Sequence, residues 1–97
     1  MKKLLLGLLF LANIAHAENE FRYAPNNAGG NIFFTYSSCV WVNTGEKIPN
    51  KYYVYTTNSS GVKTSDGCYE YKAPFYVIDW NSGGRTNINS NSTYPIN

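Results

Sequence analysis

The sequence predicts a small all-β domain held together by one disulfide, and three observations lead to this prediction. After residue 17 the chain has no leucine and few other helix formers, but it carries nine tyrosines, two tryptophans and four phenylalanines. Aromatic and β-branched residues favour strands. Clusters of Asn, Ser, Gly and Pro recur between the apolar runs, which is typical of short strands joined by turns. Two cysteines, Cys39 and Cys68, supply the bridge that so small a core requires.

The first segment of the chain, residues 1–17, has the features of a cleavable signal peptide. Two lysines form a positive start, nine apolar residues follow, and the segment ends in Ala15-His16-Ala17, the small-x-small pattern of signal peptidase. The apolar run is too short for a membrane anchor, which needs about 20 residues. We therefore expect cleavage after Ala17, an N-terminal arm over residues 18–30 and one disulfide-stapled β domain over residues 31–97.

Five strands are expected after the signal, each bounded by turn residues. They cover residues 31–36, 51–57, 62–71, 75–80 and 85–89. Asn-, Ser- and Gly-rich loops at 58–61 and 81–84 make successive hairpins, so the strands form an antiparallel meander. Since both faces carry aromatic residues, a flat sheet of this size leaves one aromatic face in water. We expect the meander to curl into a small SH3-like or OB-like barrel.

The cysteines allow only one pairing, and in an oxidising compartment we expect a Cys39–Cys68 disulfide. It would join the end of the first strand to the third and hold the curl. Closing a loop of about 30 residues stabilises the fold by roughly 3.5 kcal/mol in the chain-entropy model. A redox-active dithiol is not supported, because the cysteines are far apart and lack a C-x-x-C arrangement.

The residues after the signal exclude several classes of function. Six basic and six acidic side chains leave no net charge, so we expect no nucleic acid as a partner and no binding to an anionic membrane surface. The only histidine is His16, inside the signal. Catalysis by histidine or cysteine and zinc sites built on them are therefore excluded. We expect no enzyme, no metal, no cofactor and no stable membrane insertion.

Pairs of carboxylates remain as one catalytic possibility, since two carboxylates can hydrolyse a glycosidic bond. The candidates are Glu46, Asp66, Glu70 and Asp79. A domain of this size has little room for a substrate cleft, so we expect structural roles instead. Glu46 and Asp66 belong to turns, and Glu70 pairs with a lysine. Asp79 caps the following loop or pairs with Arg85 across its hairpin, with a ligand contact as the alternative.

The tyrosines give the strongest indication of a function. A thin core cannot bury both faces of strands that carry so many rings, so some rings are expected at the surface. Tyrosine mixed with Ser, Asn and Gly is typical of protein-binding surfaces. The predicted binding surface consists of Tyr53, Tyr55, Tyr69 and Tyr71, with Tyr52 and Val54 facing the core. The alternative is that these tyrosines only fill strand positions in an aromatic core.

A series of short motifs follows a fixed order along the chain. They are Gly29-Gly30, residues 32–35 followed by Cys39, residues 52–55, Gly67-Cys68-Tyr69, residues 77–80, Gly84-Arg85 and Tyr94-Pro95. In this order they resemble a group of short exported proteins of bacteria and prophages, over about two-thirds of the chain. Tyr69 stands where that pattern has tryptophan, and Tyr94-Pro95 comes later than in the pattern. The resemblance implies an envelope location and a phage origin, but no activity and no catalytic residue.

Two functions are compatible with these observations. The first is an exported, periplasmic binding module that engages an envelope protein, as a phage-derived inhibitor or exclusion factor does. The second is a module that binds a glycan or peptidoglycan through exposed aromatic rings. Both place the protein in the periplasm or outside the cell after removal of the signal.

Overall fold

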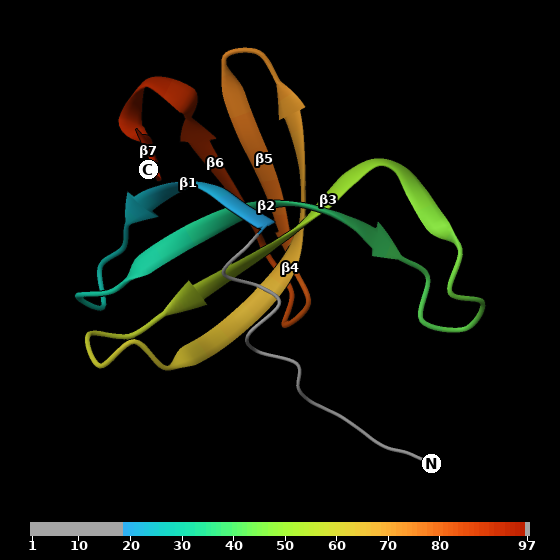
Figure 1. Cartoon of the computed structure of the whole chain (residues 1–97), viewed down its shortest axis with the longest axis horizontal. Coiled ribbons are helices and arrows are strands. Elements are labelled where there is room, and N and C mark those ends of the chain that lie inside the picture. The colour runs from blue at the N-terminus through green and yellow to red at the C-terminus, as the bar shows by residue number, and fades with distance from the viewer. Residues whose placement is uncertain (1–18, 97) are drawn as a thin grey trace.

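The computed structural model describes residues 19–96, which form one antiparallel β-sheet (Figure 1). The predicted all-β fold with one disulfide is confirmed. The predicted signal peptide, residues 1–17, lies outside the described residues. The elements are β1 (Glu20–Pro25), β2 (Asn31–Val40), β3 (Lys47–Thr57), β4 (Lys63–Lys72), β5 (Phe75–Trp80), β6 (Arg85–Asn89), the short 3-10 helix η1 (Ser90–Ser92) and β7 (Tyr94–Pro95).

Strands that follow one another along the chain are also neighbours in the sheet, so β1 to β6 form a continuous meander. β7 then returns to the other edge and pairs with β1, which gives the order β6-β5-β4-β3-β2-β1-β7. The expected curling is observed as an open half-barrel (Figure 1). Arg22 fastens the returning chain, because its guanidinium donates to the Thr93 hydroxyl (2.6 Å) and to the Thr93 carbonyl oxygen (3.1 Å).

The sheet has two strands more than expected, and both lie at the ends of the described chain. β1 forms in the segment expected to be an arm, where Ala24 pairs with Ile32 and turns into the core. Tyr23 points to the opposite face and lies between Phe33 of β2 and Tyr94 of β7. Tyr23 and Ala24 thus point to opposite faces, as neighbouring residues of a strand do.

The core lies on the concave face of the half-barrel. Phe34, Val54 and Ile78 are fully buried at the middle of β2, β3 and β5. The rings of Phe34 and Tyr69 meet edge to face, with centroids 5.2 Å apart, and Tyr76 lies 4.6 Å from Phe34. Aromatic pairs in these arrangements add to the free energy gained from burial alone. Tyrosine therefore serves as a core residue in this chain, which partly confirms the alternative interpretation of its abundance.

Gly67 allows β4 and β5 to approach closely at the centre of the sheet. It pairs with Val54 on one side and with Trp80 on the other. A Cβ atom at this position would collide with the backbone of Asp79 and Trp80. Any other residue would have to push β5 away from β4, so glycine is required for the packing of the half-barrel.

Asparagine side chains hold two of the turns together. The side-chain oxygen Oδ1 of Asn26 accepts hydrogen bonds from the backbone N–H groups of Ala28 and Gly30, and its side-chain nitrogen Nδ2 donates to β3. The Asn58 carbonyl oxygen accepts from the backbone of Ser60 and Val62 in the same way. Such side-chain caps satisfy backbone N–H groups that no strand can reach.

Candidate functional site

The structure does not bring the four tyrosines of the predicted binding surface together. Tyr53 and Tyr55 lie half-buried on the outer face of β3, opposite the buried Val54, as the alternation predicts. Tyr71 is 53% exposed, but it lies on the concave side, where it packs against Tyr76 near the end of the sheet. Only Tyr53 and Tyr55 therefore share a surface.

The prediction for Tyr69 is wrong, because this residue belongs to the core. Its side chain is only 3% exposed, and it lies in the middle of the sheet between Tyr52 and Ile78. Its hydroxyl donates a hydrogen bond to the carbonyl oxygen of Thr35 (2.7 Å). Burial raises the pKa of the Tyr69 hydroxyl well above its usual value, since the ionised form is poorly solvated there.

Five aromatic side chains form a row across the outer face of β7, β1, β2 and β3, which we call the aromatic row. Its members in order are Tyr94, Tyr23, Phe33, Tyr55 and Tyr53, with centroids of neighbouring rings 5.5, 6.3, 5.2 and 5.9 Å apart. The row results from strand pairing, because Tyr94 and Phe33 both lie opposite Tyr23, and Tyr55 lies opposite Phe33. One of its members, Tyr23, comes from the segment that was expected to be an N-terminal arm.

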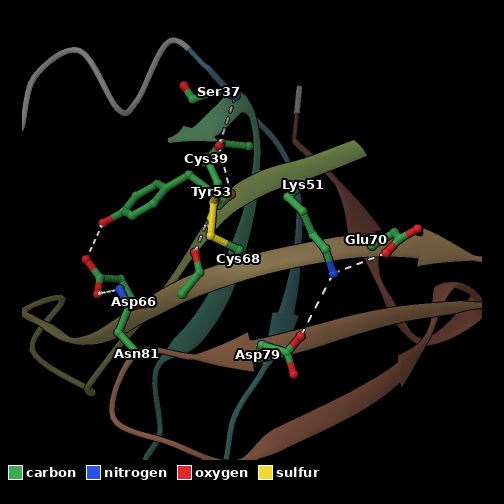
Figure 2. Close-up of a disulfide and its surroundings, with 11 residues drawn as sticks. Ser37, Cys39, Lys51, Tyr53, Asp66, Cys68, Glu70, Asp79 and Asn81 are labelled. Atoms are coloured by element: carbon green, nitrogen blue, oxygen red, sulfur yellow. Dashed lines mark hydrogen bonds and ion pairs between the residues drawn. A yellow bond between two sulfur atoms is a disulfide. The ribbon is translucent and has the colours of Figure 1, made fainter. Parts of the chain in front are cut away.

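Tyr53 is the last ring of the row, and it contacts charged and polar side chains. The Tyr53 hydroxyl donates to Asp66 (2.9 Å) and accepts from the Lys63 ammonium (2.8 Å), which also lies 5.5 Å from the Tyr53 ring centroid. Burial, followed by the hydrogen bond to Asp66 and the negative charge of Asp66, raises the pKa of Tyr53 well above its usual value. Asn81 donates to the other oxygen of Asp66 (2.9 Å; Figure 2).

A groove of about 570 Å³, which we call the loop groove, adjoins the middle of the aromatic row. Phe33 and Tyr55 form its apolar wall. The turn after β1 and the loop between β3 and β4 form its other sides. The remaining lining residues are Gly29, Gly30, Asn31, Thr57, Asn58, Ser59, Gly61, Val62 and Lys63.

The hairpin of β2 and β3 projects beyond the rest of the sheet (Figure 1). Its end carries three exposed apolar residues, Val40, Trp41 and Val42, which we call the apolar tip; they are 49%, 57% and 97% exposed. Two backbone hydrogen bonds define the tip. The Trp41 backbone N–H donates to the carbonyl oxygen of Glu46, and the Trp41 carbonyl oxygen accepts from the Gly45 N–H, both at 2.8 Å. The prediction of the binding surface missed these residues. Three apolar residues directly before the turn at 43–46 were the available indication.

The disulfide joins this hairpin to β4 just before the apolar tip and confirms the predicted pairing. Cys39 and Cys68 join β2 to β4, the strands on either side of β3, with their Cα atoms 6.1 Å apart (Figure 2). Cys39 is the residue immediately before the apolar tip and is 5% exposed. The bond therefore fixes the point from which the hairpin leaves the sheet.

The four carboxylates considered for catalysis lie in structural arrangements. Arg85 pairs with Asp79 across the β5–β6 hairpin (2.7 Å), as one of the two structural interpretations predicts. This hydrogen bond, with burial opposing it, holds the pKa of Asp79 below its usual value. Lys51 lies 3.1 Å from Glu70 and 4.0 Å from Asp79 (Figure 2). Glu46 is exposed in the hairpin turn, as expected. The turn position expected for Asp66 is wrong, because Asp66 lies within β4, where it pairs with Tyr55 of β3.

Comparisons with known proteins give no relative from which a function can be carried over. No family model, no curated protein and no solved structure matches the chain. Within residues 19–96, no helix is long and apolar enough to cross a membrane. The disulfide is a bond typical of oxidising compartments. The candidate sites are therefore the apolar tip, the aromatic row and the loop groove.

Proposed function

We propose that this chain is an exported binding module that engages another protein of the bacterial envelope through its apolar tip. The observation that carries the proposal is the exposure of Trp41 (57%) and Val42 (97%) at the end of a projecting hairpin. Tryptophan is among the residues that contribute most to binding energy at protein interfaces. An apolar cluster that a small domain holds away from its own core favours a role in recognition.

The backbone around the tip supports a protein as the partner. β1 pairs with β2 only as far as Thr35, and β4 pairs with β3 only from Tyr52 onward. In the described part of the chain, no strand pairs with the outer edges of the hairpin beyond these two positions. Open strand edges accept an added strand from a partner, which then gains main-chain hydrogen bonds in addition to apolar contacts.

The proposed location depends on other observations. Residues 1–17 have the pattern of a signal peptide, and the motif order resembles short exported proteins of bacteria and prophages. The disulfide is compatible with the oxidising periplasm. We propose that the protein acts there as a phage-derived inhibitor or exclusion factor, because a projecting apolar tip is suited to the cleft of a receptor or an enzyme.

Affinity capture with tip variants tests the proposal. The full-length chain is expressed with a C-terminal tag, and the exported protein is used to capture partners from periplasmic extract at low and high salt. The wild type is expected to enrich one envelope protein at both salt concentrations, because the contact is apolar. The double variant Trp41→Ser with Val42→Ser is expected to lose it, while its free energy of unfolding changes by less than about 0.5 kcal/mol.

A matched control is Val62→Ser, which removes another exposed apolar side chain (58% exposed) from a different loop. This variant is expected to capture the same protein as the wild type. Capture that survives the double substitution at the tip would contradict the proposal. The wild type and the double variant are also mixed with lipid vesicles. If the wild type binds vesicles and the double variant does not, the tip is a membrane contact, and this result would also contradict the proposal.

A further inference from the structure

We infer that the loop groove is a second binding site, on another part of the molecule, and that its ligand is a short neutral oligosaccharide. This inference goes beyond the proposed protein-binding role and does not depend on it. The groove and the apolar tip lie at opposite ends of the β2–β3 hairpin, since Asn31 and Thr57 line the groove and Val40 and Lys47 lie next to the hairpin turn.

The size and lining of the groove favour a sugar. Its volume of about 570 Å³ lies within the usual range for small-molecule sites. Phe33 and Tyr55 provide an apolar wall, and Asn31, Asn58 and Ser59 provide amide and hydroxyl groups around it. Within residues 19–96, the side chains of Asn31 and Ser59 make no hydrogen bond to the protein. A pyranose needs this combination, because it has an apolar ring face and a rim of hydroxyl groups.

The charge of the groove provides little attraction for a strongly anionic ligand. Among residues 19–96, Lys63 is the only charged residue that lines it. Its ammonium lies 3.5 Å from the Asp66 carboxylate and donates to the Tyr53 hydroxyl, so its charge is compensated within the protein. A phosphorylated or carboxylated ligand would find no second cation among the lining residues. Neutral hydroxyl groups match this surface better.

Side-chain hydrogen bonds hold both walls of the groove in place. Asn26 holds the turn on one side, and Asn58 holds the loop on the other. The two loops touch: a Cβ atom at Gly29 would lie 3.1 Å from Ser59, and one at Gly30 would collide with the backbone of Thr57. A site that is ordered in advance loses less conformational entropy when it binds.

The aromatic row extends the proposed site beyond the groove. From Phe33 it continues through Tyr23 to Tyr94, which is 51% exposed at the edge of the sheet. A chain of linked sugars bound in the groove can continue along this row, whereas a single small molecule cannot use it. We therefore assign an oligosaccharide, and not a monosaccharide, to the site.

The inference is tested by NMR titration with tetramers of β-1,4-linked N-acetylglucosamine and of β-1,4-linked glucose. At least one is expected to shift amide signals of residues 29–31 and 57–63, with an affinity that does not change with salt. Phe33→Leu and Tyr55→Leu keep apolar volume but remove the aromatic ring, and each is expected to weaken binding about tenfold. Ser59→Arg fills the rim from an exposed position, so it blocks the groove without removing a core residue.

Two controls separate this site from the apolar tip. Tyr71→Leu removes an exposed ring from the other face, and Trp41→Ser alters the tip; both are expected to bind the tetramers like the wild type. No shift with either tetramer, shifts outside the groove and the row, unchanged binding by Ser59→Arg, or binding that falls with added salt would each overturn the inference. Loss of partner capture by the tip variants would leave it unaffected, because the two measurements use different residues.

Discussion

Tyr69→Phe should destabilise the protein at neutral pH, and this loss should shrink as the pH rises. The substitution removes only the hydroxyl that donates to the Thr35 carbonyl oxygen at 2.7 Å. Both groups lie in the core, with Tyr69 at 3% and Thr35 at 1% exposure. Leaving a buried acceptor without this partner is expected to cost about 1–2 kcal/mol of the free energy of unfolding at pH 7.

The pH dependence follows from the raised pKa of the same hydroxyl. In the unfolded chain a tyrosine ionises near pH 10, whereas burial keeps Tyr69 protonated in the folded protein at that pH. Above about pH 10 the unfolded state therefore binds fewer protons, and the stability of the wild type falls with rising pH. The contribution of Tyr69 to this fall is about 1.4 kcal/mol by pH 11. The phenylalanine variant lacks this contribution.

The assay is urea unfolding of both proteins at several values between pH 7 and pH 11, followed by tryptophan fluorescence and circular dichroism. The two free energies of unfolding are expected to differ by about 1–2 kcal/mol at pH 7 and to be nearly equal at pH 11. Other tyrosines are present in both proteins, so their ionisation cancels in the difference. A difference that stays constant over this range would refute the assignment of Tyr69 to the core.

Three further outcomes are expected from the same structure. Cys39→Ala with Cys68→Ala should lower the free energy of unfolding by about 3.5 kcal/mol, and the intact wild type should weigh about two mass units less than its reduced form. Gly67→Ala should cost about 1–3 kcal/mol in urea unfolding, because the added methyl group collides with Trp80; wild-type stability in this variant would contradict the close approach of β4 and β5. Asp66→Asn should be less stable than the wild type at pH 7, with a difference that closes below about pH 4; although burial opposes them, hydrogen bonds from Asn81 and Tyr53 hold the pKa of Asp66 below its usual value, so its stabilisation is lost on protonation. A difference that does not narrow as the pH falls below about 4 would contradict this role.

Much of the fold follows from local patterns in the sequence. Alternation within residues 52–55 places Val54 in the core and Tyr53 and Tyr55 on the other face, as observed. The single possible cysteine pairing gives the disulfide, and turn-rich loops give the hairpins. These features depend on residues close to one another in the chain or, for the disulfide, on two cysteines that allow only one pairing.

The features that the sequence did not predict depend on pairing between distant segments. Tyr69 and Tyr71 share a face of β4, so alternation alone cannot separate them. The register of the strands separates them, because it places Tyr69 in the middle of the sheet and Tyr71 near the end of β4. The pairing of β1 with β7 likewise joins two segments that lie far apart in the sequence.

Proline also gave a misleading indication. The second strand was expected to begin at residue 51, after Pro49, yet β3 runs from Lys47 to Thr57. Pro49 is tolerated because this part of β3 lies beside β2 on one edge, while its other edge does not pair with β4. A strand edge that faces solvent does not need the N–H group that proline lacks. The same absence of a second neighbour leaves the apolar tip uncovered.

The β2–β3 hairpin connects the features on which the two proposed sites depend. Its turn end carries the apolar tip, and its other end contributes Phe33 and Tyr55 to the loop groove. The disulfide holds β2 to β4 between these ends, so the sites are parts of one ordered ribbon. A chain of this size can therefore present two surfaces of different chemistry, although its core fills only one face of the sheet.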